Sequence, residues 1–252
     1  MGGGSCKLRL LPRLDYKLNL VLWIGFSFLL YAISTNIAWH YRDPRPRRIG
    51  RLLRAVKRWP RWPFQALHLL YYLGIPYLAL LQGVTSPRLM GLVGADWFEG
   101  IGMGAALGTG AFLFLALAWW HYARAIQRSY PREGSLFSAR ISDILQPWGW
   151  PLLLLEVICL EMHWAFYRSG PTLLLDHHSG VFLGLLIALG ERYSDPNVRR
   201  SLSSPRRAEN ILMEGGMALV IAVVYLFTRN LWLCMFIHLW IEMGLLCLLS
   251  SL

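Results

Sequence analysis

Long apolar runs are the feature that most constrains what this chain can fold into. A helix needs about 20 mostly apolar residues to cross a bilayer. Seven runs approach that length, at 18–40, 64–85, 101–123, 149–168, 172–190, 211–228 and 231–251. Only 15% of the 252 residues are charged, against about 25% in soluble domains. The sequence therefore predicts an all-α, polytopic membrane helix bundle with about seven transmembrane helices.

The positive charge of the chain is concentrated beside the first apolar run. Nine of the 25 Lys and Arg residues fall in "YRDPRPRRIGRLLRAVKRWPRW", which follows that run directly. Basic segments next to a membrane helix, interleaved with tryptophan, are typical of binding to anionic lipid headgroups. We therefore expect the loop at 41–63 to contact the bilayer surface, and we expect no nucleic-acid partner despite the net charge of +11.

The distribution of basic residues also predicts an orientation. Eighteen of the 25 Lys and Arg residues lie in the connections that follow the first, third and fifth runs. Loops rich in Lys and Arg stay in the cytoplasm. This places the three loops and the C-terminus in the cytoplasm and the N-terminus outside, although the N-terminal tail carries four basic residues of its own.

Ionisable residues inside the run at 149–168 indicate a helix in the bundle interior. Such residues are costly in a membrane and are normally paired or functional. At about 100° per residue, Glu161 and Arg168 share one face, while Glu156 and His163 share another. His163 is expected to pair with Glu156 or with a backbone carbonyl of a neighbouring helix. Polar pairs on two faces keep this helix away from the lipid.

A second polar stripe lies on the last run, where Cys234, His238 and Glu242 recur every four residues. If the run at 149–168 ends near Arg168, His238 and Glu161 lie at similar depth in the outer half of the membrane. The run at 172–190 begins on the same side with "DHH", in which Asp176 is a natural helix cap. Glu214, near the other side, is expected to serve packing, and Gly100, Gly104 and Gly108 let a neighbouring helix approach closely.

Three other interpretations of these residues remain open. Cys159, His163, Cys234 and His238 form two helical Cys–His pairs that together would suit a tetrahedral zinc ion. His163 and His238 would also suit haem or a pigment as axial ligands. Alternatively, these residues bind no cofactor and serve only to hold the helix bundle together. We expect no cofactor.

The C-terminal half resembles the CAAX protease and bacteriocin-processing (CPBP, or Abi) intramembrane proteins. "YLFTRNLWLCMFIHLWIE" resembles the family's late HxxxN or HxxxD motif, with His238 at the histidine and Glu242 at the Asn or Asp position. "EMHWAFYRSG" resembles EExxxR, with Arg168 at the arginine. In that alignment His163 and Trp164 occupy the glutamate positions, and Glu161 stands two residues earlier. The family's FxxxH motif has a degenerate counterpart at 174–178.

The resemblance covers about residues 149–245 and implies a division of the chain. Residues 1–148 would form an N-terminal membrane region of three helices with the basic loop, and 149–252 a CPBP-like four-helix core. It also implies a bacterial cytoplasmic membrane and a membrane peptide or helix as substrate.

The activity that the resemblance implies is glutamate-dependent peptide hydrolysis within the membrane. Its candidate catalytic residues are Glu161, His163, Arg168, His178, His238 and Glu242. A glutamate such as Glu161 would activate water, and the histidines would assist. The alternative is a non-catalytic scaffold or partner-binding protein derived from the same fold.

Overall fold

The computed structural model describes residues 11–42, 62–129, 142 and 144–249, and these residues form eight helices and no strand. The helices are α1 (Leu11–Arg42), α3 (Trp62–Leu81), α4 (Trp97–Ser129), α6 (Gly149–Leu174), α7 (His177–Ser194), α8 (Pro196–Leu202), α9 (Pro205–Thr228) and α10 (Leu231–Leu249). The all-α prediction is confirmed for this part of the chain.

Five of these helices, α1, α4, α6, α9 and α10, are long and apolar enough to cross a membrane. The apolar part of α3 is shorter, at Ala66–Leu81, and α7 ends in a polar turn that contains Glu191 and Arg192. The chain is therefore a multi-pass membrane protein by length and composition of its helices, while the expected count of about seven spans is not confirmed.

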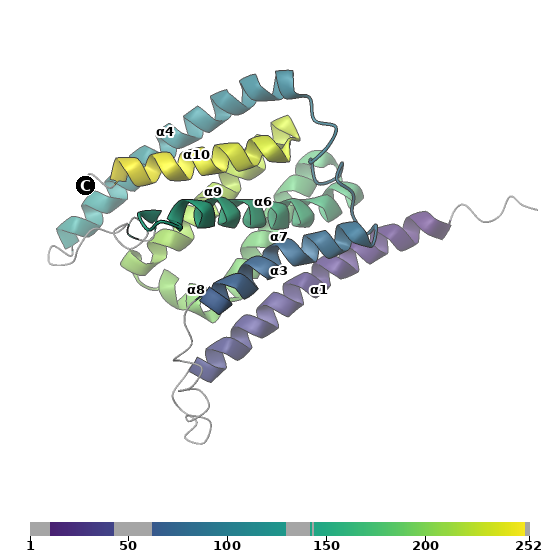
Figure 1. Ribbon diagram of the computed structural model, residues 1–252, viewed down its shortest axis with the longest axis horizontal. Helices are drawn as coiled ribbons and strands as arrows, with labels where there is room; N and C mark the ends of the chain where they lie inside the picture. The colour runs from purple at the N-terminus through teal and green to yellow at the C-terminus, as the bar shows by residue number, and fades with distance from the viewer. Residues whose placement is uncertain (1–10, 43–61, 130–141, 143, 250–252) are drawn as a thin grey trace, which may run out of the picture.

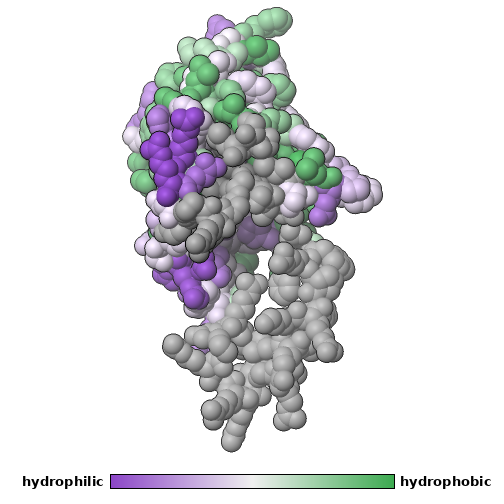
Figure 2. Space-filling model, turned by 90° about the vertical axis from the view of Figure 1, so that its left-hand side faces the viewer, coloured by the Kyte–Doolittle hydropathy of each residue, from purple (hydrophilic) through white to green (hydrophobic). Residues whose placement is uncertain are grey.

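Successive long helices run in alternating directions (Figure 1). As a result the ends of α1, α4, α7 and α10 lie on the same side as the starts of α3, α6 and α9, together with the short helix α8. We call this side the α8 end. Figure 2 looks onto it and shows hydrophilic side chains gathered there among apolar ones. The basic loop at 41–63 falls almost wholly outside the described residues.

Helix α6 occupies the centre of the bundle and packs against α1, α3, α7 and α10. Its second half is buried on every side from His163 to Pro171, as the polar residues on two of its faces predicted. The helix continues to Leu174 rather than ending near Arg168, so Glu161 lies at its middle.

Local sequence explains the ends and close contacts of two other helices. Asp176 caps α7 by accepting a hydrogen bond from the backbone N–H of Ser179, as expected of a residue at that position. Gly104 and Gly108 of α4 lie directly against Leu233 and Ile237 of α10. The predicted role of these glycines in close helix packing is confirmed.

Candidate functional site

The centre of the candidate site is a hydrogen bond between Glu161 of α6 and His238 of α10. The Glu161 Oε1 atom lies 2.7 Å from His238 Nδ1. On the other side, Oε2 of the same carboxylate lies 3.8 Å from Arg168 Nη2. All three side chains are buried. The structure thus joins Arg168 and His238, which match the two motifs, with Glu161, which stands two residues before the motif's glutamate positions.

Two aromatic rings pack against the side chains of His238 and Arg168. The indole of Trp164 stacks on the His238 ring with centroids 5.6 Å apart and an interplanar angle of 11°. The Arg168 guanidinium lies over the Tyr225 ring, 4.4 Å from its centroid. An arginine placed in this way gains a cation–π contribution that partly replaces the hydration lost on burial.

The second ring nitrogen of His238 faces a different carboxylate. Nε2 lies 3.9 Å from Glu242 Oε2, one turn further along α10. An ionised Glu161 carboxylate can only accept this hydrogen bond, in which case His238 carries its proton on Nδ1. In the neutral imidazole, Nε2 then carries the lone pair, and this nitrogen is the one that faces Glu242.

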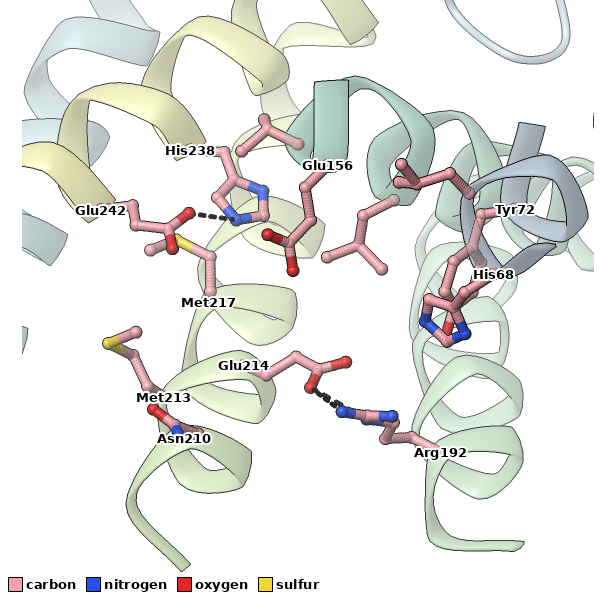
Figure 3. A pocket seen from close by; sticks show the side chains of 13 residues that line it. His68, Tyr72, Glu156, Arg192, Asn210, Met213, Glu214, Met217, His238 and Glu242 are labelled. Atoms are coloured by element: carbon pink, nitrogen blue, oxygen red, sulfur yellow. Dashed lines mark hydrogen bonds and ion pairs between the residues drawn. The ribbon is translucent and has the colours of Figure 1, made fainter. Parts of the chain in front are cut away.

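A pocket of about 270 Å³ reaches this nitrogen from the α8 end (Figure 3). His238 and Glu242 form its inner wall, and Glu156 of α6 points into the same space. Toward the mouth, Arg192 of α7 and Glu214 of α9 form an ion pair of 2.9 Å. Side-chain exposure falls from 31% at Arg192 to 5% at His238 and 0% at Glu161. Glu161 therefore lies behind His238, away from the pocket.

His163 belongs to a separate polar cluster. Its Nε2 lies 3.1 Å from Glu191 Oε2 on α7, which replaces the expected pairing with Glu156 or a backbone carbonyl. Tyr167 also donates to Glu191 and lies 3.1 Å from Ser27 of α1. Tyr71 of α3 extends the chain of hydrogen bonds to Ser27. Four helices, α1, α3, α6 and α7, are tied together here, and Tyr72, which packs against His163, also lines the pocket.

The remaining predicted residues lie elsewhere. His178 is exposed in the first turn of α7 and does not line the pocket. Cys159 packs with Tyr31 and Tyr72, whereas Cys234 lies in the main core. Among the described residues no group of three or more His, Cys, Asp or Glu side chains could hold a metal ion. Zinc and haem remain alternatives to the expectation of no cofactor.

Several residues of the pocket were not recognised from sequence. Glu214, which we expected only to serve packing, lines the pocket with Arg192. His68 and Tyr72 come from α3, in the N-terminal half that the family resemblance does not cover. The ionisable His68 within an apolar run was the available signal.

The pocket also reaches His238 from the α8 end, whereas the sequence analysis placed the cluster of polar residues in the opposite half of the membrane.

No protein family, curated protein or solved structure shows a significant match to the chain.

Proposed function

We propose that this protein is an integral membrane hydrolase of the CPBP type that cleaves a peptide bond in a membrane polypeptide. One observation carries the proposal. Glu161 holds Nδ1 of His238 at 2.7 Å, while Nε2 faces a pocket that extends to the mouth of the bundle. A buried carboxylate that orients a histidine whose other nitrogen faces a pocket is the arrangement of a general base and its positioning residue.

The proposed reaction uses His238 as the base and Glu161 as the positioning residue. A water molecule at Nε2 gives its proton to His238 as its oxygen bonds to the carbonyl carbon of the substrate. The carbonyl π electrons move onto oxygen. When they return, the C–N bond breaks and His238 gives the proton to the departing amine. The Glu161 carboxylate stabilises the imidazolium that exists between these steps.

This assignment changes the role that the resemblance implied for Glu161. A side chain with no exposed surface lies too deep to activate water itself, so it acts through His238. Glu242, on the inner wall of the pocket, is the carboxylate placed to orient the attacking water. Arg168 Nη2, 3.8 Å from Glu161 Oε2, supplies a positive charge beside this carboxyl group.

We also propose how the helices lie in the membrane. α3 and α7 complete a bundle of seven helices in the cytoplasmic membrane of a bacterium, with the C-terminus and the α8 end in the cytoplasm. The basic segment at 41–63 binds anionic headgroups on that side.

A non-catalytic scaffold is the second candidate, and one observation favours it. Both oxygens of Glu161 face positively charged or hydrogen-bonding partners, Arg168 and His238, inside the protein. Buried pairs of this kind also serve as structural ties between helices.

The two candidates differ in whether the protein cleaves polypeptides at all, and a hydrolase would need His238 to do so. We would express the parent protein, His238→Ala or Glu161→Gln in bacteria and quantify new polypeptide N-termini in the membrane fraction by mass spectrometry. Loss of a general base lowers a rate by about 100-fold or more, so we expect termini that depend on the parent protein and disappear with both variants. His121→Ala, which removes an exposed histidine of α4, is the matched control and should retain them. Identical N-termini with the parent protein, both site variants and the His121→Ala control would support the scaffold.

A further inference from the structure

We infer that His68 of α3 is a second catalytic residue, which donates a hydrogen bond to the carbonyl oxygen of the peptide bond that is cleaved. This inference rests on the proposed function and deepens it. The proposed reaction moves the carbonyl π electrons onto oxygen, and a hydrogen-bond donor aimed at that oxygen stabilises the charge as it develops.

His68 lies on the face of α3 that packs into the bundle, yet its side chain is exposed. At about 100° per residue, position 68 shares a face with Tyr72, Ile75 and Ala79, which are all buried. Leu70, on the opposite face, is 67% exposed. Because His68 lines the pocket and belongs to the inner face, its exposed surface faces the pocket and not the lipid.

The ring nitrogens of His68 form no hydrogen bond to another described residue. The imidazole is instead held by an aromatic ring, since it meets Tyr72 edge-on with centroids 4.4 Å apart and an interplanar angle of 90°. His68 is also the one His, Asp, Glu, Lys or Arg within α3. Such residues in membrane helices are normally paired or functional. A neutral imidazole has one N–H, and in His68 this donor is available to a substrate.

The other hydrogen-bond donors of the lining fit the role less well. Arg192 already donates to Glu214. Asn210 is exposed near the start of α9, at the mouth of the pocket. Tyr72 is buried, and its ring supports His68. The hydroxyl group of Tyr72 is therefore the competing donor, and Tyr72→Phe removes it while the ring remains.

The proposed base and the proposed donor line one pocket from different helices. His238 belongs to α10 and His68 to α3 (Figure 3). The pocket of about 270 Å³ compares with about 30 Å³ for each water molecule in the liquid. It therefore has room for the attacking water beside His238 together with a peptide group. The carbonyl oxygen accepts the N–H of His68, which keeps its proton throughout the reaction.

Rescue by a conservative substitution tests His68 as a donor. We would measure how fast parent-dependent N-termini appear with His68→Ala, His68→Gln and Tyr72→Phe. Loss of one oxyanion donor lowers a rate by about 100- to 1,000-fold, so we expect His68→Ala to lose the N-termini. His68→Gln supplies an amide N–H and should react at least about tenfold faster than His68→Ala. Tyr72→Phe should keep the parent rate.

Two results overturn the inference while the proposed function stands. One is a parent rate with His68→Ala, and the other is equally slow reaction of His68→Ala and His68→Gln. A parent protein that generates no new N-termini would instead contradict the proposed function itself.

A cross-linking experiment tests the placement of His68 without any hydrolysis. In a background with the native cysteines replaced by alanine, we would combine His68→Cys with His238→Cys and add a short ethane-bridged bis-methanethiosulfonate. Peptide mapping by mass spectrometry should detect the two positions joined. Leu70→Cys with His238→Cys is the matched control, because Leu70 is on the outer face of α3, and it should give no linked peptide. No link between positions 68 and 238, or equal linking in the control, overturns the inference.

Discussion

Two histidine–glutamate pairs each include one residue of α6, and these two residues, Glu161 and His163, are only two positions apart. The environments of the two pairs nevertheless differ. Glu161 pairs with His238, and His163 pairs with Glu191. His238 presents its second nitrogen to a pocket, whereas His163 is enclosed by aromatic rings such as Tyr72, 4.6 Å away between centroids. The same chemical pair therefore serves a proposed reaction in one place and holds helices together in the other.

The structural role of Glu191 gives a prediction for stability. Glu191→Ala removes the shared partner of His163 and Tyr167, both buried. Removing one member of a buried pair costs about 3–5 kcal/mol, so we expect the free energy of unfolding in detergent to fall by about 3 kcal/mol. Tyr193→Ala, on the same helix and 57% exposed, should change it by less than about 0.5 kcal/mol. A fall of under about 1 kcal/mol for Glu191→Ala would contradict the assignment.

At the scale of helices, the close packing of α6 and α7 positions the arginine of the site. A Cβ atom added to Gly184 would lie 2.7 Å from the Cα atom of Arg168, and one added to Gly180 would lie 2.5 Å from the Cα atom of Thr172. In both cases the obstacle is backbone, which cannot rotate away. Glycine at these two positions thus lets α7 lie directly against the backbone of α6 at Arg168 and Thr172.

Gly184→Ala therefore tests the link between helix packing and the site. We expect it to lower the free energy of unfolding by about 1–3 kcal/mol through overpacking and to reduce the His238-dependent N-termini, because Arg168 moves. Gly110→Ala on α4 is the matched control, since no atom lies within 4 Å of the added Cβ. There the better helix propensity of alanine should raise stability by up to about 1 kcal/mol. Equal effects of the two substitutions would refute the packing argument.

Features set by the periodicity of one helix were predictable from sequence, whereas the identity of the neighbouring helix that faces a buried side chain was mostly not. The shared face of Glu161 and Arg168 follows from their seven-residue spacing, and the contact at 3.8 Å confirms it. The partner of His163 is on another helix, and helical periodicity carries no information about which neighbour faces it. Similar depth in the membrane, together with motif order, suggested that His238 lies near Glu161, and the two side chains are hydrogen-bonded.

The end of α6 was misplaced for a local reason. Gly170 and Pro171 interrupt the apolar pattern, and proline inside a helix removes a backbone hydrogen bond. The helix nevertheless continues, and Thr172 Oγ1 donates a hydrogen bond to the carbonyl oxygen of Arg168 at 2.8 Å. Because of this error, the sequence analysis placed Glu161 in the outer half of the membrane, whereas it lies at the middle of α6.

For the whole molecule, alternating helices place α8 and the end of α7 on one side of the bundle (Figure 1). Arg192, in the last turn of α7, lines the pocket at this end. Arg199 and Arg200 lie in α8 at that end. Basic residues retained on the cytoplasmic side would make the site accessible from the cytoplasm. A substrate would then approach from that leaflet or from the cytoplasmic end of a membrane protein.

Cysteine labelling in intact cells tests this orientation. In the background without native cysteines, Gln82→Cys at the end of α3 should react with a membrane-impermeant maleimide added outside. Ser203→Cys, beyond α8, should react only after lysis. Both positions are exposed, so accessibility depends on the side of the membrane alone. The reverse pattern would place the α8 end outside and contradict the cytoplasmic assignment.

The central claim is that a buried glutamate holds a histidine whose other nitrogen is open to the pocket. Diethyl pyrocarbonate, which acylates the unprotonated nitrogen of neutral imidazole, tests it directly on the parent protein, with peptide mapping by mass spectrometry. We expect His238 to be modified and His163, 1% exposed and bonded to Glu191, to be protected. Protection of both histidines in the folded protein would contradict the account, because His238 would then be sealed in the same way as His163.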